Sequence, residues 1–93
     1  TVPVIFGHMG GSNWMDVIAF AKEQANAYLD LSAAFTPLSV KTALTEVPER
    51  CLFGSDAPFG EPKLCRQLIE FVSPSTSATE MALGGNIERL LQI

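Results

Sequence analysis

Three polar residues follow three short apolar runs at equal spacing along the chain. The residues are His8, Ser32 and Asp56, and 24 positions separate each from the next (32 − 8 and 56 − 32). The runs cover residues 2–6, 27–31 and 51–54, and Asp30 interrupts the second of them. Short, nearly continuous apolar runs are typical of parallel strands that are buried on both faces. The spacing therefore predicts three strands, each followed by a loop and a crossover helix.

Helical patterns fill the intervals between the apolar runs. Each helix is predicted to begin with a capping residue, followed in two cases by a proline at the first helical position. The predicted starts are Ser12 or Asn13, Thr36-Pro37 and Glu61-Pro62. Alternation of strand and helix indicates a parallel sheet with right-handed crossovers, so the expected fold class is α/β.

The last third of the chain predicts three helices. In the helix that starts at Glu61-Pro62, the side chains expected to face inward are Leu64, Leu68, Ile69 and Val72. A capping box at residues 77–80 predicts a short helix that Gly84-Gly85 breaks, and Asn86 is expected to cap the last helix. Among the aromatic residues, Phe59 is expected at the mouth of a pocket, and packing roles are expected for Trp14, Phe20, Phe35 and Phe71.

The equal spacing has a geometric consequence for the three polar residues. Parallel strands end at one edge of a sheet, where α/β proteins bind ligands, so His8, Ser32 and Asp56 are expected there together. His8 lies among glycines that permit a sharp turn, and an imidazole can bind metal or move a proton. A carboxylate at Asp56 can serve as metal ligand and base. The alternatives are a His8 bonded to a loop carbonyl, an Asp56 that caps the loop before Pro58, and a Ser32 without a role in binding.

Charge and composition argue against several classes of partner. The net charge is −4 and the six Lys and Arg residues are scattered, so no basic face for nucleic acid or for an anionic membrane is expected. No apolar run reaches the roughly 18–20 residues of a membrane span. Cys51 and Cys65 are expected to be buried free thiols, which favours a reducing cytoplasm. The expected partner is a small-molecule substrate.

Three ordered motifs resemble the end of an amidohydrolase-superfamily protein. They are Gly7-His8-Met9-Gly10-Gly11, the LFGSDAPF sequence of residues 52–59, and the GNIERLL sequence of residues 85–91. Together they are similar to the amidohydrolase-related branch that includes aminocarboxymuconate-semialdehyde decarboxylase and related lactone hydrolases. The resemblance covers essentially all of the chain. It implies that residues 1–93 are one partial domain, made of three consecutive βα units of a (β/α)8 TIM barrel, like strands six to eight, with C-terminal helices.

The resemblance also implies the chemistry of the site. Asp56 matches the last-strand aspartate that binds the metal and handles the proton of the attacking water. His8 matches the histidine that sits beside the metal and polarises the substrate or moves a proton. The implied cofactor is a divalent metal, most commonly zinc. The implied activity is hydrolysis or decarboxylation of a small carboxylate, amide or lactone, with His8 and Asp56 as candidate catalytic residues and metal ligands.

Part of the family's pattern is missing from the chain. The family's first-strand His-x-His pair and a further histidine would lie upstream of Thr1, and His8 with Asp56 alone falls short of the three protein ligands of a catalytic zinc site. Three strands cannot close a barrel. The chain by itself is therefore expected to be inactive and to expose two sheet edges, which self-association or a complementary N-terminal segment would cover. The alternative is a non-catalytic α/β binding or assembly module.

Overall fold

The computed structural model describes residues 2–33 and 36–92, and it contains a three-stranded sheet. The strands lie in chain order and pair in parallel; they are β1 (Val4–Phe6), β2 (Ala27–Asp30) and β3 (Cys51–Leu52). Among these described residues the sheet is open, because β1 and β3 each pair on one side only. The predicted α/β class and the parallel order of the three strands are therefore confirmed.

The crossover helices occur where the sequence predicts them. Helix α1 (Trp14–Glu23) joins β1 to β2 after a turn, η1 (Gly7–Asn13), and α2 (Pro37–Glu46) joins β2 to β3 before a second turn, η2 (Pro48–Arg50). Helix α3 (Pro62–Val72) follows β3. None of the helices in the described part of the chain is long and apolar enough to cross a bilayer.

Two of the three predicted helix starts have the expected capping hydrogen bond. The side chain of Thr36 accepts from the Ser39 N–H at 3.2 Å, and that of Glu61 accepts from the Leu64 N–H at 3.0 Å. Asn13 is the residue before α1, but its side chain makes no capping bond. A proline follows each of these two N-cap residues. At the first helical position a backbone N–H has no partner within the helix, so proline costs no hydrogen bond there.

The cap of the short helix α4 (Thr76–Glu80) differs from the prediction. Ser75 is the N-cap, and its Oγ accepts from the Ala78 N–H at 3.0 Å. Ser75 has the extended backbone that this position requires (φ −159°, ψ 159°), whereas Ser77 already lies inside the helix. The predicted capping box at residues 77–80 is therefore wrong by two residues.

The glycine pair does not break the C-terminal helix, and Asn86 does not cap it. Gly84-Gly85 belongs to a π-helical turn, η3 (Met81–Gly85), that continues into α5 (Asn86–Leu91). Asn86 is fully buried, and its side-chain amide donates to the carbonyl of Pro48, the first residue of η2, at 2.7 Å and to that of Cys51, the residue after η2, at 2.8 Å. Packing against β3 thus overrides the local preference of glycine and asparagine for helix ends.

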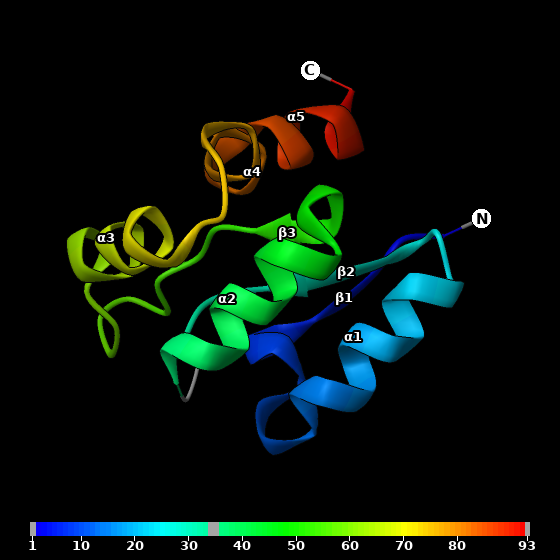
Figure 1. The fold of residues 1–93 in the computed structure, drawn as a ribbon, viewed down its shortest axis with the longest axis horizontal. Coiled ribbons are helices and arrows are strands. Elements are labelled where there is room, and N and C mark those ends of the chain that lie inside the picture. Colours follow the sequence, from blue (N-terminus) through cyan, green and yellow to red (C-terminus); the bar gives the residue numbers. More distant parts are fainter. Residues whose placement is uncertain (1, 34–35, 93) are drawn as a thin grey trace.

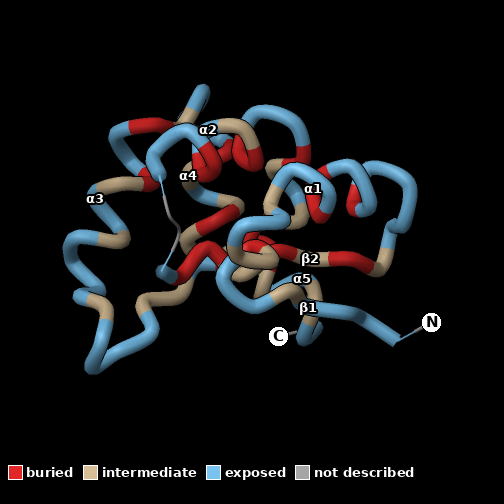
Figure 2. The backbone as a smooth tube through the Cα atoms, turned by 90° about the horizontal axis from the view of Figure 1, so that it is seen from below, coloured by how far each residue is buried: buried red, intermediate tan, exposed pale blue. Residues whose placement is uncertain are grey.

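The helices form two layers around the sheet. Helices α1 and α2 cover one face, while η3 and α5 lie against β3 on the other side (Figure 1). Seen from below, buried segments concentrate in β2 and on the inner sides of α1 and α2, and the edge strand β1 is largely exposed (Figure 2). The layer between β2 and the two helices is therefore the core of the molecule.

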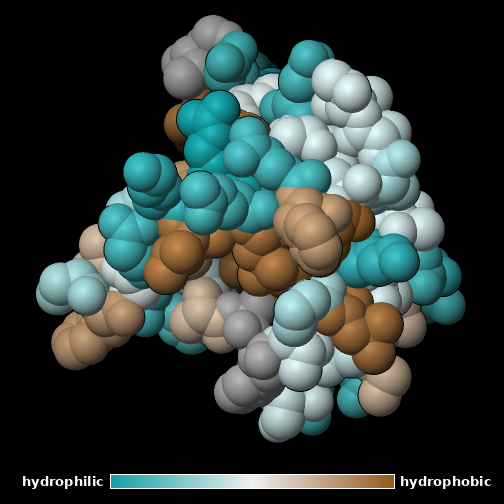
Figure 3. Space-filling view, turned by 60° about the vertical axis from the view of Figure 1, so that its left-hand side comes forward, coloured by the Kyte–Doolittle hydropathy of each residue, from teal (hydrophilic) through white to brown (hydrophobic). Residues whose placement is uncertain are grey.

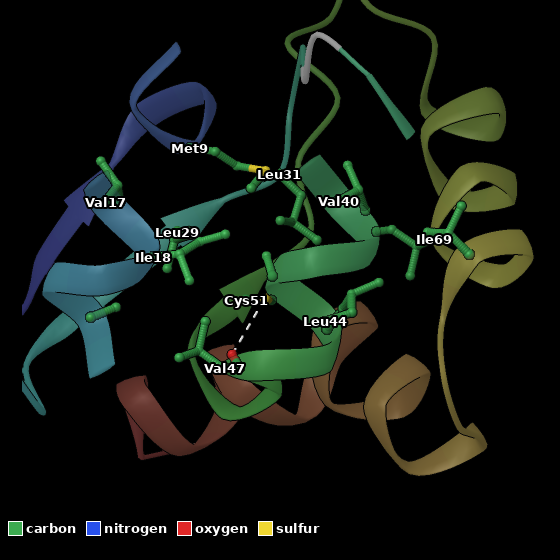
Figure 4. Close-up of a cluster of buried hydrophobic side chains, with 14 of the residues drawn as sticks. Met9, Val17, Ile18, Leu29, Leu31, Val40, Leu44, Val47, Cys51 and Ile69 are labelled. Carbon is green, nitrogen blue, oxygen red and sulfur yellow. Dashed lines mark hydrogen bonds between the residues drawn. The ribbon is translucent and has the colours of Figure 1, made fainter. Parts of the chain in front are cut away.

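Side chains from all three strand–helix units fill this core (Figure 4). Leu29 and Leu31 project from the second strand unit toward α1 and α2. They belong to a buried cluster that also includes Met9, Val17, Ile18, Val40, Leu44, Val47, Cys51 and Ile69. Because side chains alternate along a strand, packing Leu29 and Leu31 into the core directs Asp30 and Ser32 to the opposite face.

Several apolar side chains are more exposed than the sequence predicts. Leu64 is 65% exposed and Phe71 is 88% exposed, because α3 packs against α2 mainly through Ile69 and Val72. Phe59 is 90% exposed, and Phe35 lies outside the described residues. Apolar patches are visible among polar surface when the molecule is viewed from its α3 side (Figure 3). The predicted packing holds for Phe20, whose ring contacts Phe6 edge to face, and for Trp14, which packs against the core.

Candidate functional site

A left-handed turn follows β1 and carries His8. His8 and Met9 have φ values of 54° and 59°, and Gly10 and Gly11 continue the turn at 84° and 61°. Left-handed backbone costs roughly 1–2 kcal/mol at a residue with a Cβ. Met9 is 1% exposed and anchors the turn in the core, which offsets this cost. A Cβ at Gly10 would collide with Val17, and its φ of 84° disfavours other residues, so a glycine is required at this position of the turn, whereas a Cβ at Gly7 would meet open space.

The turn places the His8 imidazole beside β2. Its Nδ1 lies 3.0 Å from the Ser32 Oγ and 3.1 Å from the Ser32 carbonyl oxygen. The His8 backbone N–H donates to the Asp30 carboxylate at 3.1 Å. The imidazole is 48% exposed, and its Nε2 has no hydrogen-bond partner within the described residues. His8 and Ser32, which lie one period apart in the sequence, are therefore in contact. The alternative of a His8 bonded to a loop carbonyl is also observed, since Nδ1 lies 3.1 Å from the Ser32 carbonyl oxygen.

Asp30 is the residue of this cluster that the sequence interpretation missed. Its carboxylate accepts from the Ser32 hydroxyl at 2.5 Å, from the Ser32 N–H at 3.2 Å and from the His8 N–H. These bonds compensate a carboxylate whose side chain is only 25% exposed. The missed signal was the two-residue separation of Asp30 and Ser32, which places both side chains on one face of a strand.

The third strand approaches the same carboxylate through a glycine. Gly54 is the second residue after β3, and a Cβ there would collide with the Asp30 carboxylate oxygen, so this position must be a glycine. The cluster of His8, Asp30 and Ser32, called the His8 cluster below, is thus enclosed by segments that follow all three strands.

Asp56 lies at the same edge of the sheet but outside the His8 cluster. It follows β3 by four residues, in an exposed loop, with a φ of 60°. Its backbone carbonyl accepts from the Gly60 N–H at 2.9 Å, and a Cβ at Gly60 would collide with the Ser55 carbonyl. No ion pair or hydrogen bond of its carboxylate occurs with any of residues 2–33 and 36–92. The predicted shared edge is observed, whereas direct contact of Asp56 with His8 is not.

The His8 cluster and Asp56 do not form a metal site by themselves. In the part of the chain that the structure describes, no three His, Cys, Asp or Glu side chains gather closely enough to hold an ion. A catalytic zinc ion takes three protein ligands, so these residues fall short of a complete set. What the His8 cluster offers chemically is one oriented imidazole with a free ring nitrogen at the sheet edge.

The cysteines offer no nucleophile at this edge. Burial, with a smaller effect from the Glu49 carboxylate, raises the pKa of the Cys51 thiol to about 12. The thiol contacts the Val47 carbonyl oxygen at 3.4 Å (Figure 4). Cys65 is partly buried in α3, and both cysteines are free. The expected buried free thiol is therefore confirmed for Cys51, and a protonated thiol is a poor nucleophile.

Comparisons with known proteins agree with this architecture. A family model described as Amidohydrolase matches residues 1–93. A crystal structure of 2,6-dihydroxybenzoate decarboxylase complexed with 2,6-dihydroxybenzoate superposes with a TM-score of 0.76 at 20% sequence identity. That superposition covers 97% of this chain and 34% of that chain, so this chain spans about a third of the decarboxylase. No curated protein matches the sequence at a significant level. The open sheet and its helices thus match part of a TIM-barrel-like fold.

Proposed function

Because the chain belongs to the amidohydrolase family, we propose that it is the C-terminal portion of a (β/α)8-barrel enzyme that hydrolyses or decarboxylates a small molecule. The observation that supports this most directly is the His8 imidazole, held by Asp30 and Ser32 with its Nε2 free. It follows the carboxyl end of a parallel strand, where barrel enzymes have their active sites. The family match supports an enzyme of this kind, and the oriented imidazole is the group suited to acid–base chemistry.

The proposed roles divide between two residues. His8 serves as the acid–base group through Nε2, taking a proton from or giving one to the substrate. Asp56 is one ligand of a divalent metal, with zinc the first candidate, and the remaining ligands come from other strands of the barrel. When bound, such an ion would polarise a substrate oxygen or lower the pKa of a water molecule. The exposed carboxylate of Asp56, free of partners among the described residues, is available for this role.

The proposed substrates are small carboxylates, amides and lactones. The decarboxylase that this chain resembles in fold is complexed with a small aromatic carboxylate, 2,6-dihydroxybenzoate. That likeness motivates including aromatic carboxylates in the first assay panel. The two free cysteines favour a reducing compartment, and we propose the cytoplasm.

The test uses the full-length protein that contains this chain. We expect His8→Gln to lower turnover about 10²- to 10⁴-fold, the usual contribution of a general acid or base. We expect Asp56→Asn to lower both turnover and the metal content of the purified protein. CO₂ release from aromatic carboxylates and hydrolysis of amides and lactones measure turnover, and elemental analysis measures the metal.

Asp16→Asn is the matched control, since it removes one exposed carboxylate from α1 without touching the His8 cluster. The control should retain wild-type activity and circular dichroism. Activity of both His8→Gln and Asp56→Asn within twofold of the control would refute the proposed function and favour a non-catalytic module.

We also propose that this chain is active only when another segment or chain pairs with the free edges of β1 and β3. Strands β1 and β3 each leave one edge unpaired, and Val4 and Ile5 of β1 are exposed. Unpaired strand edges promote pairing with another chain or segment. A complementary N-terminal barrel segment, or a second copy of this chain, would satisfy them.

A further inference from the structure

The hydrogen bonds around His8 have a definite direction. A carbonyl oxygen can only accept, so the bond between Nδ1 and the Ser32 carbonyl requires a proton on Nδ1. The Ser32 hydroxyl donates to the Asp30 carboxylate at 2.5 Å, a distance typical of a charge-assisted O–H···O bond. Its oxygen is therefore left to accept from Nδ1 as well. Both partners of Nδ1 act as acceptors, and this assigns one tautomer to the neutral ring.

We propose that Asp30 and Ser32 are positioning residues that hold the neutral His8 imidazole as the Nδ1–H tautomer and leave the Nε2 lone pair at the sheet edge. The inference deepens the proposed function, on which it rests for the identity of His8 as the acting group. The tautomer of a histidine is set by the hydrogen bond that its other nitrogen makes. Here that bond is made to Ser32, and Asp30 fixes which way the Ser32 hydroxyl points.

Asp30 acts on His8 through two connections. It orients the Ser32 hydroxyl, and it also accepts the backbone N–H of His8 itself. The second bond ties the left-handed turn to β2, so the carboxylate fixes both the backbone and the ring of His8.

The same geometry argues against Ser32 as a nucleophile. A nucleophilic serine donates its hydroxyl proton to a histidine nitrogen that acts as base. In this structure the Ser32 hydroxyl proton points to Asp30, and the histidine nitrogen facing Ser32 is the protonated one. Ser32 is moreover buried, at 3% exposure. The hydrogen bonds thus run from His8 Nδ1 to the Ser32 oxygen and from the Ser32 hydroxyl to Asp30, so Ser32 and Asp30 hold the histidine in place.

The test reads the tautomer directly. Long-range ¹H–¹⁵N spectra of the histidine-labelled full-length protein distinguish a protonated Nδ1 from a protonated Nε2, at about pH 8.5, where an ordinary histidine is neutral. The His8 signals are assigned by their loss in His8→Gln. We expect the wild type to show the Nδ1–H pattern.

Substitutions at Ser32 and Asp30 should affect this tautomer pattern differently. Ser32→Ala keeps the Nδ1–H form, because the backbone carbonyl still accepts from the ring. Asp30→Ala frees the Ser32 hydroxyl to donate to Nδ1, and the tautomer ratio should shift toward Nε2–H by roughly 3- to 10-fold, the equivalent of one ordinary hydrogen bond. The double variant Asp30→Ala/Ser32→Ala has no hydroxyl and should return to Nδ1–H.

Turnover supplies the second readout. Loss of a residue that orients a functional histidine typically costs 10- to 100-fold in activity, so Asp30→Ala should lower kcat by about that factor while Asp16→Asn does not. An Nε2–H pattern in the wild type or in Ser32→Ala overturns the proposal, and this holds even if Asp30→Ala fails to fold. An unchanged tautomer in a folded Asp30→Ala also overturns it. If His8→Gln keeps full activity while the tautomers change as stated, the proposed function fails and the positioning assignment stands.

Discussion

Asn86 links α5 to the start of β3 through two hydrogen bonds. Asn86→Asp should break this link and lower the free energy of unfolding. The Asn86 side-chain amide donates to the carbonyls of Pro48 and Cys51 at 2.7 and 2.8 Å, and the residue is fully buried. Asn86→Asp keeps the shape of the side chain but replaces the donor with an acceptor. Both carbonyls would then face a carboxylate oxygen; that of Cys51 would lose the donor that Asn86 supplies, and that of Pro48 would keep only the Cys51 backbone N–H.

The expected cost follows from these two lost bonds. A buried acceptor left without its partner costs about 1–3 kcal/mol, as at Cys51, and the loss of one of two bonds at Pro48 costs about 0.5–1.5 kcal/mol, which together gives about 1.5–4.5 kcal/mol. The Arg89 guanidinium, which donates to the Asn86 oxygen at 3.1 Å, would offset a small part of this. Native proteins have a free energy of unfolding of about 5–15 kcal/mol. The substitution should therefore remove a large share of the stability.

Urea unfolding of the full-length protein, followed by circular dichroism, measures the change. Asn13→Asp is the matched control, because Asn13 is exposed and its side chain makes no capping bond. We expect the control to change the free energy of unfolding by less than about 0.5 kcal/mol. A loss below about 1 kcal/mol in Asn86→Asp would show that the two carbonyls do not depend on this side chain, and the reasoning would be wrong.

Two further predictions concern the thiols and the sheet edges. At pH 8, iodoacetamide should modify Cys65 in the folded protein and Cys51 only after denaturation, because a pKa of about 12 keeps the buried Cys51 thiol protonated across the ordinary pH range; equal modification rates would contradict this. Expressed alone, residues 1–93 should associate or require a complementary barrel segment, as measured by size-exclusion chromatography with light scattering; a well-folded monomer would refute the proposed covering of the edges.

The equal spacing of polar residues predicted the most important relation in the fold. Because one strand, one loop and one helix fill each period, residues separated by one period occupy equivalent positions on neighbouring parallel strands. His8 and Ser32 illustrate this, since they lie one period apart and are in hydrogen-bond contact. The strand pairs, the proline-led starts of α2 and α3, and the apolar sides of α1 and α2 were predictable for the same reason, which is that local signals and tertiary packing agree there.

The incorrect predictions concern residues whose roles are set by partners far away in the sequence. Asn86 has the composition of a helix cap, but two carbonyls on another element recruit its amide into the core. Leu64 has the helical spacing of an inward residue, yet it is 65% exposed because it lines an open pocket beside Ile69. Asp30 was interpreted as an interruption of an apolar run, because its donors, on His8 and Ser32, are brought to it only by the fold.

The position of Asp56 shows what a shared sheet edge does and does not determine. His8 and Asp56 are two strands apart in an open sheet, so being at the same edge does not bring them into contact. In a closed barrel the strands tilt around a common axis, and the carboxyl ends of non-neighbouring strands converge on one opening. Contact between neighbouring strands, as in the His8 cluster, needs only correct register. Convergence of His8 with Asp56 on one ligand depends on closure of the sheet, and for that reason activity is expected of the closed barrel rather than of the open three-stranded sheet.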